Sequence, residues 1–285
     1  MSKRVLDPEA DWQYLHVIFK AVGKGHGSDP YVFCKRKRKK FLDELVRYLK
    51  LYSPIEMLGF CVISNHAHCI FAIPKKVSIS LSQVARQYEA CYGTSMDARS
   101  HKCHLLRKDL NNISKFVQRF EHDFAVEFNK SSLFKRQGSL WVPRFHNTLL
   151  CNWKSLSKCW QYVEFNSVKA GLTPDPEAYE FGLMGAEEKL KTHCLRNFYK
   201  HFKRLAPTFN QNSISYDEFV KLLTNKLVDE ARKLNLLGLE KYQENNQLWH
   251  HRVVGTEEEV GKLFSSGKIT ARLSDMGIAE GLCFI

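Results

Sequence analysis

The fold is decided by a stretch in the first quarter of the chain, which reads Phe60-Cys61-Val62-Ile63-Ser64-Asn65-His66-Ala67-His68-Cys69-Ile70-Phe71. Two apolar runs, residues 55–63 and 66–73, are separated there only by Ser64 and Asn65. Apolar runs of this length joined by two small polar residues are typical of a β-hairpin. The sequence therefore predicts two antiparallel strands at this point.

The second of these strands carries two histidines. Alternate side chains of a strand share a face, so His66 and His68 are expected to point the same way while Ala67 faces the opposite side. Imidazole is the commonest metal-binding side chain, and two on one face can bind a single divalent cation. This spacing also occurs in strands that bind no metal, so the pattern alone leaves both interpretations open.

The remaining patterns predict helices and strands in mixed order. Aromatic and β-branched residues predict a strand over 12–20, where His16 is expected to be a structural histidine. Apolar spacing of three and four residues predicts helices over 35–51 and 110–128, and the polar stretch over 80–92 is also expected to be helical. A strand is predicted over 140–145, and a helix from the N-cap Asn152 through Ala170, with Gly171 as its C-cap. This order predicts the α+β class.

The predicted helix over 152–170 places Tyr162 and Asn166 one turn apart on one face. Its apolar stripe consists of Leu156, Cys159, Trp160 and Val163. Tyr162 lies at the edge of that stripe, about 100° from Val163. A tyrosine in such a place is usually a core or interface residue, so periodicity alone gives it no chemical role.

In combination, these segments resemble a known family. The strand beginning at Asn65-His66-Ala67-His68 resembles the His-hydrophobic-His motif of HUH endonucleases, and residues 138–145 are similar to the strand that precedes their tyrosine helix. The segment Tyr162-Val163-Glu164-Phe165-Asn166-Ser167-Val168-Lys169-Ala170-Gly171-Leu172 resembles the tyrosine helix of the REP-associated tyrosine transposases, an insertion-sequence-200-like branch of the HUH single-strand transposases. Ser167 stands where that branch usually has proline. The resemblance covers residues 10–180.

The resemblance implies an α+β fold in which a central antiparallel sheet is flanked by helices. This HUH, ferredoxin-like catalytic domain would span residues 1–180, and a mostly helical region of open role would follow over 181–285. His66 and His68 would bind Mg²⁺ or Mn²⁺, with Asn166 completing the site. Tyr162 would attack a phosphate of single-stranded DNA, leaving a 5′-phosphotyrosine and a free 3′-hydroxyl that allows strands to be rejoined in DNA transposition.

Two alternatives to a transposase stay open on the sequence. One is a catalytically inactive nucleic-acid-binding protein on the same scaffold, and the other is a plasmid-type nickase with the same chemistry. The target sequence, any hairpin-forming character of the DNA, and the choice between monomer and homodimer are not decided by the sequence.

Charge supports a nucleic-acid partner. The net charge is +13; residues 1–172 hold 28 basic and 14 acidic residues, a net of +14, and residues 173–285 hold 15 and 16, a net of −1. A basic field confined to one part favours a polyanion. We expect Trp141 or Trp153 to stack on bases. The candidate DNA-binding cations are Lys35, Arg36, Lys37, Arg38, Lys39, Lys40, Arg119, Lys135, Arg136 and Arg144.

Several classes are disfavoured. The nine cysteines form no Cys-x-x-Cys pair, which favours free thiols over a disulfide framework. His101, Cys103 and His104 have no second half at zinc spacing. The first residues lack the apolar core of a secretory signal, and no run of about 18 apolar residues indicates a membrane span. We therefore expect a cytoplasmic protein.

Overall fold

The computed structural model describes residues 7, 9–22, 32–130, 139–206, 214–237, 253–265, 277–279 and 282–284. Its strands are β1 (Trp12–Lys20), β2 (Glu56–Val62), β3 (His66–Pro74), β4 (His146–Leu150), β5 (Val253–Gly255), β6 (Gly277–Ala279) and β7 (Leu282–Phe284). Its helices are α1 (Lys35–Leu51), α2 (Leu81–Tyr92), α3 (His101–Asp109), α4 (Ile113–Lys130), α5 (Trp153–Glu164), α6 (Asn166–Lys169), the 3₁₀ turn η1 (Pro176–Ala178), α7 (Glu188–Leu205), α8 (Tyr216–Leu237) and α10 (Glu257–Ser265).

The strands form one sheet in the order β2-β3-β1-β4-β5-β7-β6. Only β4 and β5 pair in parallel; the other neighbours are antiparallel. The first four strands and the helices α1 and α4 between them follow the ferredoxin-like pattern. The α+β class with a mostly antiparallel sheet is therefore confirmed.

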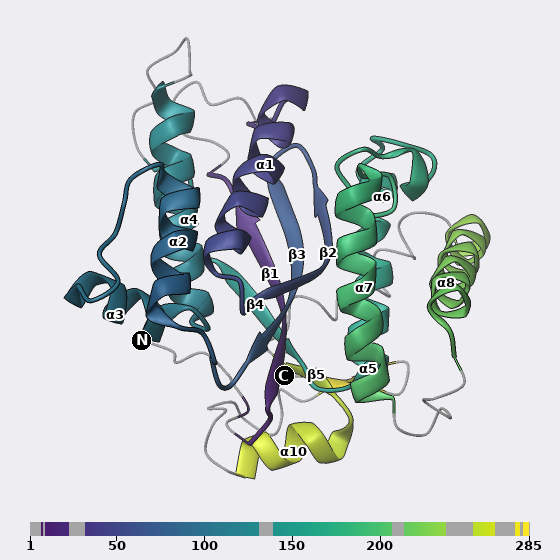
Figure 1. Ribbon diagram of the computed structural model, residues 1–285. Coiled ribbons are helices and arrows are strands. Elements are labelled where there is room, and N and C mark those ends of the chain that lie inside the picture. Colours follow the sequence, from purple (N-terminus) through teal and green to yellow (C-terminus); the bar gives the residue numbers. More distant parts are fainter. Residues whose placement is uncertain are drawn as a thin grey trace.

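Helices cover both faces of the sheet (Figure 1). Helices α1, α2 and α4 lie on one face, and α5, α7 and α8 lie on the other, with α10 below. The first face is closed by aromatic side chains: Phe19 of β1 contacts Phe41 of α1 and Phe120 of α4 at ring-centroid distances of 5.6 and 5.3 Å. Edge-on aromatic packing of this kind stabilises a core beyond the area that it buries.

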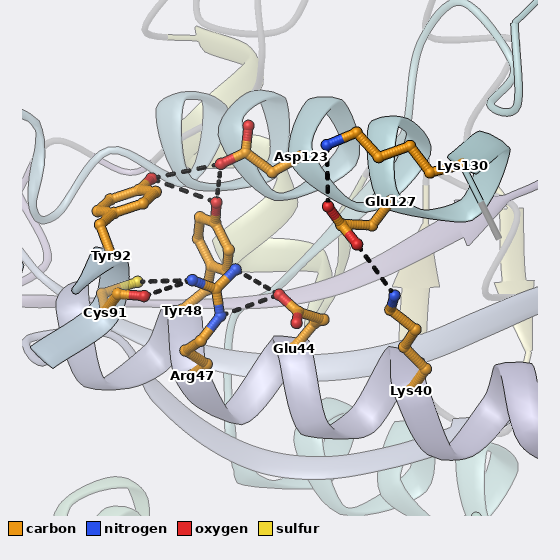
Figure 2. A network of polar contacts seen from close by, with 9 residues as sticks. All are labelled: Lys40, Glu44, Arg47, Tyr48, Cys91, Tyr92, Asp123, Glu127 and Lys130. Atoms are coloured by element: carbon orange, nitrogen blue, oxygen red, sulfur yellow. Dashed lines mark hydrogen bonds and ion pairs between the residues drawn. The ribbon is translucent and has the colours of Figure 1, made fainter. Parts of the chain in front are cut away.

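A polar network ties the outer helices of that first layer together (Figure 2). The hydroxyls of Tyr48 and Tyr92 both donate to the carboxylate of Asp123, and Arg47 donates to the Cys91 carbonyl. These contacts join the ends of α1 and α2 to the middle of α4. Because buried polar groups are costly unless they are paired, the network fixes how the three helices pack.

The hairpin and the helix capping agree with the sequence. Val62 pairs with Ala67, which makes β2 and β3 the predicted hairpin. Asn152 caps α5 through Ser155, and Gly171 has a φ of 65° beyond α6, where the Leu172 amide donates to the Ser167 carbonyl. Glycine adopts this left-handed conformation without strain, so it ends the helix as predicted.

Two predictions about local structure are wrong. The predicted strand over 140–145 is not a strand: Trp141 makes an isolated bridge to Ala21, and the ladder begins at His146. Pro143 explains the shift, because it has no amide hydrogen to donate to a ladder. The predicted single helix over 152–170 is interrupted at Phe165, where the Asn166 side chain donates to the carbonyl of Tyr162 and competes with the backbone ladder.

The region after residue 180 contributes to the same sheet. Helix α7 packs on the face of β2, and β5 extends the sheet beyond β4. Most described residues of this region are helical, but the three short strands β5, β6 and β7 were not predicted. The cysteines whose side chains are described are free thiols. No helix within the described residues is long and apolar enough to cross a membrane.

Candidate active site

The candidate site lies on the face of the sheet that α5 covers. In the β1–β3 ladder, Lys20 is opposite His66 and Ile18 is opposite His68. Directly paired residues share a face, and so do alternate residues of one strand. His16, Ile18 and Lys20 therefore lie on the same face as both histidines of β3.

His66 and His68 are adjacent on this face, with ring centroids 4.8 Å apart. The Nδ1 atom of His66 is 2.6 Å from the Oδ1 atom of Asn65 in the hairpin turn. The Nδ1 atom of His68 is 2.9 Å from the Nε2 atom of His16, and both of these rings are buried. Each β3 histidine is thus held through Nδ1, which leaves Nε2 as the ring nitrogen for a metal ion.

Helix α5 brings Tyr162 to the histidines. Its apolar stripe docks on β2 and β3, and Trp160 lies so close to Gly59 that a Cβ there would be 2.9 Å from its Cδ1 atom. With the helix set at this short distance, the Tyr162 ring meets the rings of His68 and His16 edge-on, at centroid distances of 5.5 and 6.0 Å. The phenol and the imidazoles therefore occupy one side of the sheet.

The surroundings of Tyr162 favour the neutral phenol. Burial raises the pKa of Tyr162 to about 12, nearby Cys159 also raises it, and a hydrogen bond from the Asn166 carboxamide lowers it. The Asn166 Nδ2 atom also donates to the Tyr162 carbonyl over 3.0 Å. At neutral pH the Tyr162 phenol is consequently protonated, and a nucleophilic role would need help from its surroundings.

Lys169 is a functional candidate that the sequence interpretation missed. Its Nζ atom lies 3.9 Å from the centroid of the Tyr162 ring, a cation–π distance. Burial lowers the pKa of Lys169 to about 7, whereas the charge of Glu230 in α8 raises it. The signal was the seven-residue spacing from Tyr162 to Lys169, which is two helical turns. His16 is buried and contacts His68, a contact that no pattern in β1 indicated.

Glu164 anchors the helix that carries Tyr162. Its Oε2 atom accepts a hydrogen bond from the Met184 amide over 3.1 Å. Burial raises the pKa of this carboxyl to about 8, and the amides of Met184 and Leu183 lower it. The contact fixes the end of α5 to the segment that runs beside β2 through Gly182 and Leu183.

The donors at the site are of mixed type. Within the described ranges, no group of three or more His, Cys, Asp or Glu side chains is arranged to hold a metal ion. Among the described residues, the imidazoles of His66 and His68 and the buried carboxamide of Asn166 are the candidate ligands beside Tyr162. Such a partial set fits an open site, in which substrate oxygens and water occupy the other positions. His101 and His104 lie exposed on α3, and Cys103 is buried.

The basic run at the start of α1 lies at the same end of the sheet. The Phe33 amide donates to the Ser64 carbonyl in the turn that leads into His66. Four cations of the run are engaged: Lys35 pairs with Glu180, Lys37 covers the Phe128 ring, and Arg38 donates to Tyr179. The fourth, Lys40, pairs with Glu127, as Figure 2 shows. Arg36 and Lys39 are exposed, and neither has an ion pair in the described part of the chain.

The other predicted DNA-binding residues lie in different parts of the chain. Arg144 is exposed just before β4. Arg119 lies on α4, in the opposite layer, with its guanidinium 5.9 Å from the Tyr52 ring centroid. Lys135 and Arg136 lie outside the described residues. Lys20, which no sequence pattern indicated, is exposed beside His66.

The two tryptophans that we expected to stack on bases differ in their exposure. Trp141 is buried among Phe33, Phe41 and Phe124, and its Nε1 atom donates to the Glu121 carbonyl over 2.8 Å. Trp153 packs against Phe202 and Phe198 of α7. Trp141 is therefore part of the aromatic core, whereas Trp153 is partly buried at its edge.

The geometry of this chain defines an α+β fold built on one mostly antiparallel sheet. No protein-family model matches the chain, and no curated protein matches it. A solved structure, described as a REP-associated tyrosine transposase bound to a REP hairpin, is similar to this chain at 14% identity and a TM-score of 0.34. The similarity covers 65% of this chain and 82% of that one.

Proposed function

We propose that the protein is a metal-dependent transposase or endonuclease that cleaves and rejoins single-stranded DNA through Tyr162. One observation carries the proposal: the Tyr162 ring lies 5.5 Å from the ring of His68, on the face that His68 shares with His66. A phenol beside a pair of imidazoles held through Nδ1 combines a nucleophile with metal ligands.

His66, His68 and Asn166 are the proposed ligands of Mg²⁺ or Mn²⁺. Imidazole is a softer ligand than Mg²⁺ prefers, which favours Mn²⁺, whereas the carboxamide oxygen of Asn166 suits either ion. When bound, the ion supplies a Lewis acid for the non-bridging oxygens of a phosphodiester.

Tyr162 is the proposed nucleophile. Its oxygen forms a bond to phosphorus, the bond from phosphorus to the 3′-oxygen breaks, and the phenolic proton is lost while the leaving oxygen gains one. The products are a 5′-phosphotyrosine and a free 3′-hydroxyl, and attack by another 3′-hydroxyl reverses the step and joins strands. In its protonated form, Lys169 favours the phenolate form of Tyr162, because a cation over the ring is attracted to its face, most strongly when the ring is negative.

The basic end of the sheet is the proposed path for the DNA. Arg36, Lys39, Arg144 and Lys20 are exposed there, close to the strand ends that carry the site. Charge of this kind also suits a nucleic-acid-binding protein without catalysis, so binding alone does not separate the two functions.

The test is covalent capture of DNA. Wild-type protein mixed with single-stranded oligonucleotides, including hairpin-forming ones, and Mn²⁺ is expected to give a protein–DNA adduct on a denaturing gel. Tyr162→Phe is expected to lose the adduct and keep DNA binding, while the matched control Tyr14→Phe, on the same sheet face, keeps both. An undiminished adduct in Tyr162→Phe would reject the role of Tyr162, and binding without any adduct in the wild type would favour the non-catalytic alternative.

A further inference from the structure

His16 occupies the centre of β1, directly behind the candidate metal-binding pair. It is fully buried, its Nε2 atom is 2.9 Å from the Nδ1 atom of His68, and the two rings are nearly parallel, with centroids 5.1 Å apart and 12° between their planes. The ladder fixes this contact: His16 is opposite Ile70 and Ile18 is opposite His68, so the two histidines are diagonal neighbours on one face.

A hydrogen bond between two ring nitrogens needs one donor and one acceptor. If His16 donated, the proton of neutral His68 would sit on Nε2, and that nitrogen would have no lone pair for a metal ion. If His68 donates from Nδ1, its Nε2 atom carries the lone pair. The direction of this one hydrogen bond therefore decides whether His68 is able to act as a ligand.

His66 shows how the direction is set at the neighbouring position. Its Nδ1 atom faces the Oδ1 atom of Asn65 at 2.6 Å, and a carboxamide oxygen only accepts hydrogen bonds. The proton of His66 is thus on Nδ1 and its lone pair on Nε2. The Nδ1 atom of His68 faces a histidine, whereas the Nδ1 atom of His66 faces an amide oxygen. For His68 to adopt the same tautomer as His66, His16 must accept the hydrogen bond.

We propose that His16 is a positioning residue that accepts the Nδ1–H of His68 and so presents the His68 Nε2 lone pair to the metal ion. The inference rests on the proposed function, because it assigns His16 a task toward that ion. Metal-binding histidines generally donate their other ring N–H to an acceptor, often a carboxylate. Unlike a carboxylate acceptor, a neutral imidazole adds no negative charge. The positive potential that attracts a phosphodiester is therefore not reduced.

The experiment measures Mn²⁺ binding by full-length protein without DNA, from the electron paramagnetic resonance signal of free Mn²⁺. His16→Phe removes the acceptor and is expected to weaken Mn²⁺ binding by about 10–100-fold. His16→Gln keeps an acceptor oxygen and is expected to stay within a few-fold of the wild type. The control Tyr14→Phe, two residues away on the same face, loses its hydrogen bond to His201 and is expected to bind Mn²⁺ like the wild type.

The outcomes separate this inference from the proposed function. Equal Mn²⁺ binding by wild-type protein and by His66→Ala/His68→Ala would remove the metal site and the inference together. Binding that depends on His66 and His68 but is unchanged in His16→Phe overturns the role of His16 alone. An equal loss in His16→Gln and His16→Phe also overturns it, because the acceptor oxygen then has no effect.

If His16→Phe does not fold, a second measurement tests the inference. Long-range ¹H–¹⁵N spectra distinguish the two neutral tautomers of a histidine, and His68→Ala assigns the signal. The wild-type protein is expected to show His68 protonated at Nδ1. A His68 protonated at Nε2 means that the hydrogen bond runs the other way, and it overturns the inference without any assay of activity.

Discussion

The two faces of β1 carry side chains of opposite character. Leu15, Val17 and Phe19 point toward α1 and α4 and are fully buried in an apolar core. Tyr14 and His16 point toward α7 and α5, where they are buried too, but each holds a hydrogen bond to another side chain. The comparison teaches that one strand separates the packing that stabilises the fold from the polar contacts that arrange the candidate chemistry.

The largest expected effect strikes the polar face. His66→Ala/His68→Ala is expected to lower the rate of oligonucleotide cleavage by roughly a thousandfold or more and to abolish its dependence on Mn²⁺, because a metal ion supplies several kcal/mol of charge stabilisation. Cleavage assays with and without Mn²⁺ measure this. Cleavage at the wild-type rate would contradict the assignment of both histidines.

The apolar face gives the converse result. Phe41→Ala deletes a fully buried ring that contacts Phe19 and Phe120 and is expected to lower the free energy of unfolding by about 3–5 kcal/mol. Denaturant unfolding checks this, and Mn²⁺ affinity under folding conditions is expected to stay at the wild-type value. A fall in Mn²⁺ affinity in the folded variant would show that the two faces are not separable.

Lys169 tests whether the polar face extends to α6. Lys169→Met is expected to slow adduct formation by about 30-fold, since a desolvated cation–π contact contributes about 2 kcal/mol. Single-turnover rates at saturating DNA measure the effect, and Lys169→Arg is expected to recover part of the rate. Lys189→Met, at an exposed position of α7, serves as the control; an equal loss there would make the effect nonspecific.

The pH dependence of stability tests the role of the buried carboxyl of Glu164. Its pKa is raised by burial from 4.5 to about 8, so between these values the folded protein keeps a proton that the unfolded chain releases. The contribution of Glu164 to the free energy of unfolding is therefore fully present below about pH 4.5. It falls as the pH rises toward 8, by at most about 1.4 kcal/mol per pH unit. Urea unfolding from pH 5 to 8 is expected to show a flatter profile for Glu164→Gln than for the wild type, and the exposed Glu177→Gln keeps the wild-type profile.

The smallest effect concerns the surface at the metal end of the sheet. Arg36→Ala/Lys39→Ala is expected to reduce the slope of log K against log salt for single-stranded DNA by about 0.7 for each phosphate that these two side chains neutralise. Binding titrations at several salt concentrations measure the slope. Lys189→Ala/Arg196→Ala removes the same charge from α7 and is expected to leave the slope unchanged; an equal change would show that overall charge, rather than this surface, binds the DNA.

Local patterns predicted most of the elements but not their exact ends. The hairpin of β2 and β3, the capping of α5 by Asn152 and the end of α6 at Gly171 follow from side-chain chemistry within a few residues. The strand over 140–145 was wrong because Pro143 outweighs the aromatic neighbours that favoured it. The short strand β5 was missed because its partners β4 and β7 lie far away in the chain.

The candidate site divides in the same way. His66 and His68 share a face by the two-residue period of a strand, which is visible in the sequence. His16 joins Tyr162 only through the docking of α5 on the sheet, whereas Lys169 meets Tyr162 across two helical turns of neighbouring chain. No spacing in the chain indicates a contact between residues 16 and 68, because it depends on the register of β1 against β3.

By itself, the sequence determined most of the helices, the β2–β3 hairpin, the alternation of polar and apolar faces, and the basic character of the first 172 residues, since these depend on each side chain and its near neighbours. Only the tertiary structure decided which face the phenol shares, which imidazole stands behind His68, and which cations stay exposed. Those relations arise when segments far apart in the chain pack together, and they depend on the packing free energy of the whole core.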